Sequence, residues 1–334
     1  MNVTVAISMG DFNGIGPEII LKSLETYSPP NVTPLILGRP DVFDYYAENC
    51  KIRFTPEVIE DISSLIYGKV NLLLCPATTE EDMKAEPGEI SETAGRAAME
   101  CVDLGIDLCL KNYADALVTA PISKEAISIA GYQFPGHTEF LAEKTGISDY
   151  MMILVSGSLR VGLVTGHVPV SDISKNLSKD RIIKKINRMD QSLKHDFGIS
   201  DPKIAVFGLN PHAGDGGVIG DEEKRLISPA IETVRNNGVK AEGPFPADGF
   251  FGSSMHNHYD GIVAMYHDQG LVPFKALSFG SGVNVTAGLP IVRTSPDHGT
   301  AFSIAGKNRA DSRSFTEAYK LAVLMAGKRK STDG

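Results

Sequence analysis

The sequence predicts an α/β fold with a mostly parallel sheet, divided into two domains. The chain has 334 residues, and a domain commonly takes roughly 100–200 residues. Short apolar runs alternate with longer segments of helical spacing, a pattern typical of βαβ units. The composition, 42% hydrophobic and 22% charged, is that of an ordinary globular protein with sizeable cores.

Eight short apolar runs are expected to form strands, because each has strand length and is bounded by polar or turn residues. They are 3–8, 33–38, 70–75, 116–120, 151–156, 160–166, 203–209 and 261–266. A further apolar stretch, 289–292, runs into Arg293.

Three segments between these strands have helical patterns. The clearest is 179–197, where Ser178 suits the N-cap and Gly198 the end of the helix. A second helix is expected from about Glu92 to Asn112 with Ser91 as its cap, and a third over 221–238 with a kink at Pro229. No internal repeat or linker marks a domain boundary.

Charge and composition limit the function. The net charge of −9 gives little electrostatic support for binding nucleic acid, although local cations can still bind small anions. The N-terminus lacks the basic region of a signal peptide, and no apolar run approaches the roughly 20 residues of a membrane span. The four cysteines form no CxxC pair, so we expect reduced thiols in a cytoplasmic protein and no cysteine-bound metal.

Polar residues collect directly after the predicted strands. His167, His212 and His267 each follow one strand, and parallel strands bring their carboxyl ends to one edge of a sheet. Three converging imidazoles would bind a divalent metal such as zinc, cobalt or nickel with one position open for catalysis. The alternative is that each histidine only hydrogen-bonds its own loop, and both interpretations stay open on spacing alone.

Several other polar residues are candidates for binding an anionic ligand. His137 and Thr138 precede an amphipathic segment, where Thr138 would cap the helix and His137 would face a ligand, unless this is a simple capping turn. Lys275, Asn284 and Arg293 lie in apolar or glycine-rich sequence, where a charge needs a partner. A phosphorylated hydroxy acid would use both cations, whereas the alternative for Lys275 is an ordinary ion pair.

The glycine motifs do not match a Rossmann fingerprint. Residues 10–19 form a strand-to-helix turn with Pro17 at the first helical position. Residues 214–220 match G-x-G-x-x-x-G loosely, but they do not open directly off a strand. Residues 297–311 offer another glycine-bearing loop. Three histidines are expected to have no ligand role, at a helix end or in a surface loop: His195, His256 and His258.

Seven segments together resemble one known family. They read "GDFNGIGPEI", "TAPISKEAI", "PGHTEFLAE", "GLNPHAGDGG", "PADGFF", "MYHDQGLVPFK" and "GVNVTAGLPIVRTSPDHGTA". In this order, over nearly the whole chain, they resemble the 4-hydroxythreonine-4-phosphate dehydrogenases of pyridoxal phosphate biosynthesis. The segments "GDFNGIGPEI" and "HGTAFSIAGK" are also similar to segments of isopropylmalate and isocitrate dehydrogenases, whose fold that family shares.

The resemblance implies a particular architecture. It implies a two-domain isocitrate/isopropylmalate dehydrogenase-like fold with mostly parallel sheets and an active-site cleft between the domains. Residues 1–125 plus 290–334 would form the cofactor side, and 126–289 the metal, substrate and dimer side. It also implies a homodimer with a shared active site, in which His267 belongs to the partner's metal site.

The resemblance also implies roles for individual residues. One divalent metal (Zn, Co or Mg) would be held by His167, His212 and His267. The remaining roles fall in three groups. The substrate would be contacted by His137, Thr138, Lys275, Asn284 and Arg293. NAD, or NADP, would be contacted by Asp297, His298 and Gly299. The catalytic residues would be Lys275 and Asp248.

The implied reaction is NAD-dependent oxidation of 4-phosphohydroxy-L-threonine to 2-amino-3-oxo-4-phosphobutanoate, which decarboxylates to 3-amino-2-oxopropyl phosphate. The alternative substrate is D-erythronate or D-threonate 4-phosphate, because such relatives carry the same residues. Phe12 and Asn13 depart from the Pro-Ala that the family's first motif commonly has. Two other classes remain as rivals: a metal-dependent hydrolase and a non-catalytic phosphometabolite-binding protein.

Overall fold

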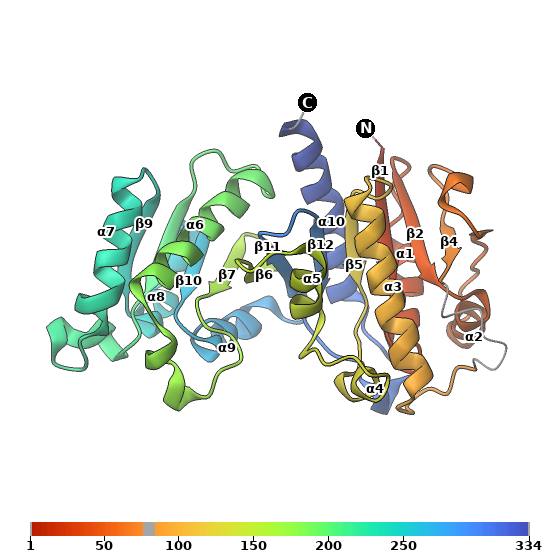
Figure 1. The fold of residues 1–334 in the computed structure, drawn as a ribbon, viewed down its shortest axis with the longest axis horizontal. Coiled ribbons are helices and arrows are strands. Elements are labelled where there is room, and N and C mark those ends of the chain that lie inside the picture. Colours follow the sequence, from red (N-terminus) through yellow and green to blue (C-terminus); the bar gives the residue numbers. More distant parts are fainter. Residues whose placement is uncertain (1, 76–83, 333–334) are drawn as a thin grey trace. The chain divides into compact units, whose positions relative to one another are not determined.

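The chain folds into two units. The computed structural model describes residues 2–75 and 84–332 (Figure 1). Residues 1–148 and 289–330 form the first unit, and the second consists mainly of Asp149–Gly288. The second unit is therefore inserted into the chain of the first. Residues 126–148, which the resemblance implied for the second domain, belong to the first unit.

The first unit contains a parallel sheet with the strand order β3-β4-β2-β1-β5-β12. Its strands are β1 (Val3–Ser8), β2 (Val32–Gly38), β3 (Glu57–Ile59), β4 (Asn71–Leu74), β5 (Ala116–Thr119) and β12 (Val292–Pro296). In β1, β2, β5 and β12 every residue is buried, as expected of parallel strands covered on both faces.

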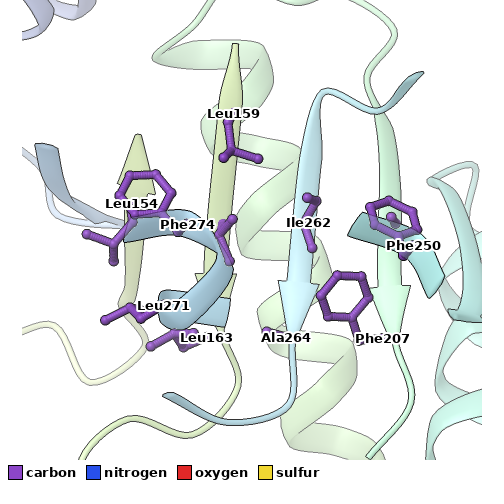
Figure 2. Close-up of a cluster of buried hydrophobic side chains, with 11 residues drawn as sticks. Leu154, Leu159, Leu163, Phe207, Phe250, Ile262, Ala264, Leu271 and Phe274 are labelled. Atoms are coloured by element: carbon purple, nitrogen blue, oxygen red, sulfur yellow. The ribbon is translucent and has the colours of Figure 1, made fainter. Parts of the chain in front are cut away.

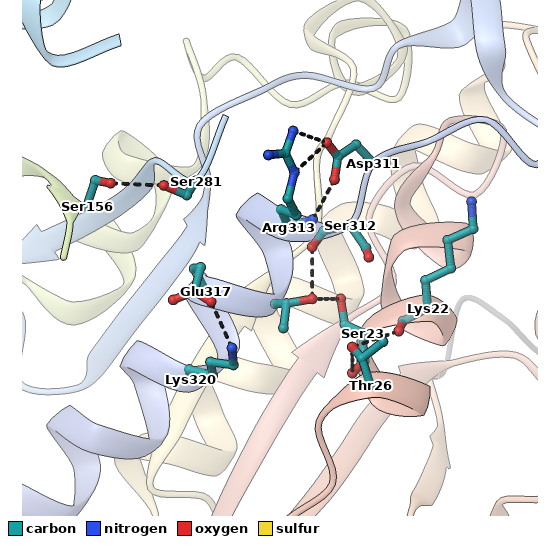
Figure 3. Close-up of polar contacts among 11 residues, drawn as sticks. Lys22, Ser23, Thr26, Ser156, Ser281, Asp311, Ser312, Arg313, Glu317 and Lys320 are labelled. Carbon is teal, nitrogen blue, oxygen red and sulfur yellow. Dashed lines mark hydrogen bonds and ion pairs between the residues drawn. The ribbon is translucent and has the colours of Figure 1, made fainter. Parts of the chain in front are cut away.

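Helices cover this sheet. They are α1 (Gly16–Thr26), α2 (Pro40–Cys50), α3 (Glu92–Leu110), α4 (Lys124–Ile129), α5 (His137–Thr145) and α10 (Arg313–Thr332), with short 3₁₀ turns at Ile62–Ser64 and Phe302–Ile304. A hydrogen bond joins α10 to α1, since the Thr316 hydroxyl donates to that of Ser23 over 2.8 Å. At the start of α10, Arg313 pairs with Asp311 (Figure 3).

The second unit has the strand order β11-β6-β7-β10-β8-β9. Its strands are β6 (Met151–Ser156), β7 (Leu159–Leu163), β8 (Lys203–Phe207), β9 (Lys240–Phe245), β10 (Gly261–Ala264) and β11 (Val283–Ala287). Strands β7, β10, β8 and β9 are parallel, while β6 is antiparallel to both of its neighbours. The prediction of a mostly parallel sheet is confirmed, and the antiparallel strand is an addition to it.

The helices of the second unit lie on both faces of its sheet. They are α6 (Lys179–His195), α7 (Ser228–Asn236), α8 (Ala247–Gly252) and α9 (His267–Ser278), with a π-helical turn at Glu223–Ile227 and 3₁₀ turns at Val170–Asp172, Ser174–Asn176, Pro211–Gly217 and Met255–His258. Leu271 and Phe274 of α9 pack with Leu154, Leu163 and Ile262 of the strands (Figure 2). Since side chains alternate along a strand, α6, which packs against Gly162 and Gly261, covers the opposite face.

The caps predicted from the sequence are confirmed for two helices. The Ser178 hydroxyl accepts a hydrogen bond from the amide of Arg181, and that of Ser91 from the amide of Ala94. The cap predicted at Thr138 is wrong. Helix α5 already begins at His137 with Gly136 as its N-cap residue, so Thr138 lies inside the first turn.

Other departures concern elements that the pattern did not reveal. Strands β3, β9 and β11 were not predicted, and neither was α9, which continues through Pro273. The strand predicted over 261–266 ends at Ala264, because Tyr266 is the N-cap residue of α9. None of the helices within residues 2–75 and 84–332 combines the length and apolar composition needed to span a bilayer.

Candidate active site

Three neighbouring parallel strands of the second unit carry the predicted metal ligands beyond their carboxyl ends. Strand β10 lies between β7 and β8, with Ile262 opposite both Val161 and Ala205. His167 follows β7, His212 follows β8 and His267 begins α9 directly after β10. The edge predicted from the spacing of the histidines is therefore formed by adjacent strands, where ligands of α/β proteins commonly bind.

Side-chain hydrogen bonds fix the ends of these strands. The Thr165 hydroxyl donates to the carbonyl of Met265 over 2.7 Å and joins the ends of β7 and β10. Gln269 accepts from the amide of Met265 at 2.7 Å and donates to the carbonyl of Gly208 at 2.6 Å. Gln269 thus bridges the ends of β10 and β8. This role was not predicted from the sequence, although Gln269 stands two residues from His267.

Two of the three predicted ligands lie in contact. The ring centroids of His167 and His267 are 5.5 Å apart, with 43° between the ring planes. A tetrahedral zinc ion bound by two imidazole nitrogens at about 2.0–2.1 Å holds the ring centroids roughly 5 Å apart. Nδ1 of His267 pairs with the Asp268 carboxylate at 2.7 Å, which leaves Nε2 for a ligand. This donor pair fits a divalent ion.

The third predicted ligand, His212, lies in an unusual turn. Five consecutive residues, His212 to Gly216, have φ values of 54°, 51°, 78°, 41° and 63°. Within the described part of one chain, no cluster of three or more His, Cys, Asp or Glu side chains is arranged to hold a metal ion. One chain therefore brings together His167 and His267, and the full ligand set, including the assignment of His267 to a partner, stays a prediction.

The first unit contains a buried cation beside a neutral imidazole. Arg293 in β12 is 1% exposed, and its Nη2 donates to the Thr119 hydroxyl over 2.6 Å. Burial lowers the pKa of Arg293 to about 9, opposed in part by Glu139. Burial, and then the charge of Arg293, hold the pKa of His137 well below its usual range, and Nε2 of His137 has no hydrogen-bond partner. A fixed guanidinium beside an unsatisfied ring nitrogen can bind an anionic oxygen.

The remaining predicted substrate and catalytic residues differ in exposure. Thr138 is half-buried in α5. Asn284 is half-buried in β11, and its Oδ1 is buried without a hydrogen-bond partner. Lys275 is exposed on α9, and Asp248 is exposed in the first turn of α8. The unsatisfied amide oxygen makes Asn284 the strongest candidate of these four for contact with a ligand.

The predicted cofactor residues lie in the loop after β12. The amide of Asp297 donates to the Ser314 hydroxyl at 3.1 Å, and Nδ1 of His298 lies 3.1 Å from the carbonyl of Gly299. Further along this loop, the carbonyl of Thr300 accepts from the amide of Ile15 at 3.0 Å. The loop is therefore attached to the turn that precedes α1.

That turn explains the two departures from the family's first motif. Phe12 is 1% exposed and belongs to the core. Asn13 accepts from the amide of Glu86 at 2.8 Å and donates to Ser91 at 3.3 Å, so its side chain is bonded twice to the stretch of chain that precedes α3. Asp11 in the same turn is fully buried, and this burial raises its pKa to about 6 against the opposing backbone amides of Asn13 and Gly14.

The fold defines the class first: a two-unit α/β protein in which one unit is inserted into the chain of the other and the sheets are mostly parallel. The fold is shared with a β-decarboxylating dehydrogenase from Thermococcus kodakarensis at a TM-score of 0.50, 14% identity and coverage of 97% of this chain and 85% of that one. At this identity the likeness concerns the fold alone. A family model described as pyridoxal phosphate biosynthetic protein PdxA matches residues 31–322. The chain belongs to this family, which confirms the resemblance seen in its motifs.

Close relatives carry dehydrogenase names. A 4-hydroxythreonine-4-phosphate dehydrogenase from Bacteroides thetaiotaomicron is 43% identical over 96% of this chain and 88% of its own. A D-threonate 4-phosphate dehydrogenase from Salmonella typhimurium is 40% identical over 97% of this chain and 99% of its own. A crystal structure of 4-hydroxythreonine-4-phosphate dehydrogenase from Klebsiella pneumoniae has a TM-score of 0.88 at 39% identity, covering 98% of each chain. The chain is thus a member of a family of dehydrogenases.

Proposed function

We propose that this protein is a metal- and NAD-dependent 4-hydroxythreonine-4-phosphate dehydrogenase, with NADP as the alternative cofactor. It would oxidise 4-phosphohydroxy-L-threonine to 2-amino-3-oxo-4-phosphobutanoate, which decarboxylates to 3-amino-2-oxopropyl phosphate. The observation that carries this proposal is that His167, His212 and His267 follow three adjacent parallel strands, β7, β8 and β10, beyond their carboxyl ends. The family membership of the chain supports the same reaction.

In this proposal His167, His212 and His267 hold a divalent metal (Zn, Co or Mg). Such an ion, when bound, orients a substrate hydroxyl, lowers its pKa and stabilises negative charge on the oxygen that it contacts. The active enzyme would be a homodimer in which the two chains share this site.

The other residues act on the substrate and cofactor. Arg293 binds an anionic group of the substrate, and neutral His137 offers a hydrogen bond beside it. Thr138, Asn284 and Lys275 complete the substrate contacts and orient the carbon from which hydride leaves. Asp248 and Lys275 are the proposed proton-transfer groups. The loop of Asp297, His298 and Gly299 contacts NAD, whose nicotinamide accepts the hydride.

The second candidate is the oxidation of a four-carbon sugar acid phosphate, D-threonate or D-erythronate 4-phosphate. It is supported by the relatives named D-threonate 4-phosphate dehydrogenase, which are 38–40% identical and match nearly as well as those named for hydroxythreonine phosphate. The two substrates differ at one carbon, which carries an amine in one and a hydroxyl in the other. Residues around that carbon would decide between them.

Parallel assays would test the proposal. NADH formation is measured with 4-phosphohydroxy-L-threonine, D-threonate 4-phosphate and D-erythronate 4-phosphate, after chelation and after return of zinc, cobalt or magnesium. We expect metal-dependent turnover of the first substrate, lost in His267→Ala and retained in His195→Ala, a histidine at the exposed end of α6. Turnover of a sugar acid phosphate alone would favour the second candidate. The absence of NADH from all three would refute both.

A further inference from the structure

A buried carboxylate, Glu223, holds the loop that carries His212. Glu223 is 4% exposed, and its Oε1 accepts from the backbone amides of Leu209 at 2.7 Å and Asn210 at 2.8 Å. Its Oε2 accepts from Nδ2 of Asn210 at 3.0 Å. Hydrogen bonds to a buried carboxylate are among the stronger ones in proteins, so the chain leaving β8 is fastened at this point.

The loop that follows requires such a support. His212, Ala213 and Asp215 have positive φ values, which residues with a side chain rarely adopt. Conformations of this kind persist only where the surrounding structure imposes them, and they concentrate at functional sites. Together with Gly214, Gly216 and Gly217, these three residues form an unbroken run of positive φ values, which sets the course of the backbone at His212.

The loop is also closely packed around the carboxylate. A Cβ atom added to Gly214 would lie 2.6 Å from Oε2 of Glu223, and one added to Gly208 would lie 2.9 Å from Cα of Ala213. Both glycines are therefore needed for the backbone to approach this closely. Glu223 itself is the first residue of the π-helical turn Glu223–Ile227, an irregularity that often marks functional sites.

We infer that Glu223 is a positioning residue for His212, and this inference rests on the proposed metal-binding role of that histidine. The carboxylate holds the backbone of Leu209 and Asn210 in place through hydrogen bonds. The left-handed turn that follows packs closely around the same carboxylate. Without the Glu223 carboxylate, the backbone of the turn adopts other φ values, and the imidazole of His212 moves away from the position in which it binds the metal. Groups that orient metal ligands typically change metal affinity by about 10- to 100-fold when they are replaced.

The test compares Glu223→Gln and Glu223→Ala with Glu232→Gln, a matched control that removes an exposed charge from the helix following the π-helical turn. The first measurement is the dissociation constant of Co²⁺. The chelator-treated protein is titrated with Co²⁺, and binding is monitored through the visible absorbance of the bound ion. We expect about 10- to 100-fold weaker binding for Glu223→Gln, a larger loss for Glu223→Ala, and a change of less than about twofold for the control. Wild-type affinity in both Glu223 variants would overturn the inference.

The second measurement needs no metal. Histidine ¹⁵N resonances of the metal-free protein are recorded, and that of His212 is assigned with His212→Ala. We expect the resonance of His212 to move in both Glu223 variants, while those of His195 and His258 stay in place. If wild-type protein fails to bind Co²⁺, the proposed metal role fails, and the resonance of His212 still decides whether Glu223 positions it.

A third variant covers the case in which Glu223→Ala does not fold. Asn210→Ala removes the side-chain hydrogen bonds to Glu223 and to Glu222 and leaves both backbone hydrogen bonds to Glu223. We expect a severalfold loss of Co²⁺ affinity with an unchanged unfolding temperature of the metal-free protein. A loss of unfolding temperature with unchanged affinity would show a purely structural role and overturn the inference.

Discussion

Replacing Arg293 with methionine should stabilise the substrate-free protein while it abolishes substrate binding. Burial lowers the pKa of Arg293 from 12.5 to about 9. At about 1.4 kcal/mol per unit, the charged guanidinium costs the folded state about 5 kcal/mol at neutral pH. Replacing Arg293 removes this cost, but it also removes the hydrogen bond to Thr119, which lowers the gain in stability by about 1–2 kcal/mol. The net gain is about 3 kcal/mol, or roughly 6–12 °C for a unit of this size.

The assay is thermal and urea unfolding at pH 7.5, with and without inorganic phosphate. Enzyme activity is then measured separately. Arg313→Met is the matched control, since the Arg313 side chain is 66% exposed and its ion pair contributes little. Phosphate should raise the unfolding temperature of the wild-type protein and of the control, and not that of Arg293→Met. If Arg293→Met is less stable than the wild type, other groups in the protein compensate the charge, and the predicted cost of burying it is wrong.

Three further changes test other parts of the structure. Because burial raises the pKa of Asp11 from 3.8 to about 6, its contribution to stability is present below pH 4 and lost as the pH rises through 6. Asp11→Asn should therefore be more stable by about 3 kcal/mol at pH 8 in urea titrations, and a difference independent of pH would contradict this. Phe274→Ala should cost about 3–5 kcal/mol in the core of the second unit, against less than about 0.5 kcal/mol for the exposed Phe279→Ala. Ser178→Ala should cost about 1 kcal/mol by removing the cap of α6, and Ser178→Asp should restore it; equal stability of all three proteins would exclude the cap.

The candidate site could be predicted where it depends on strand ends. An apolar run followed by a histidine predicts an imidazole at the edge of a parallel sheet, and His167 and His267 do lie together there. The contribution of Gln269 could not be predicted, because its partners are backbone groups at the ends of two strands. Neither could the conformation of His212, since the carboxylate that supports its loop stands eleven residues further along the chain.

The missed elements have physical reasons as well. Helix α9 contains Pro273, which normally ends a helix, yet Leu271 and Phe274 on either side of it are buried against the sheet. Packing therefore outweighs the local preference against a helix. Strand β11 pairs antiparallel with β6, from which it is separated by more than 120 residues, and no local pattern specifies such a partner. Thr138 had the chemistry of a cap, but the helix begins two residues too early for its side chain to act as one.

The order of segments along the chain has a consequence for synthesis on the ribosome. The first unit is interrupted after residue 148 and resumes at residue 289. Strand β5 therefore leaves the ribosome with one edge unpaired, and β12, its partner, is translated only after the whole inserted unit. Helix α10, which supplies the buried Phe315 and Tyr319, emerges later still. The inserted unit, made of one continuous segment, can complete its fold first, and the nascent first unit has to be kept from aggregating until residues 289–330 arrive.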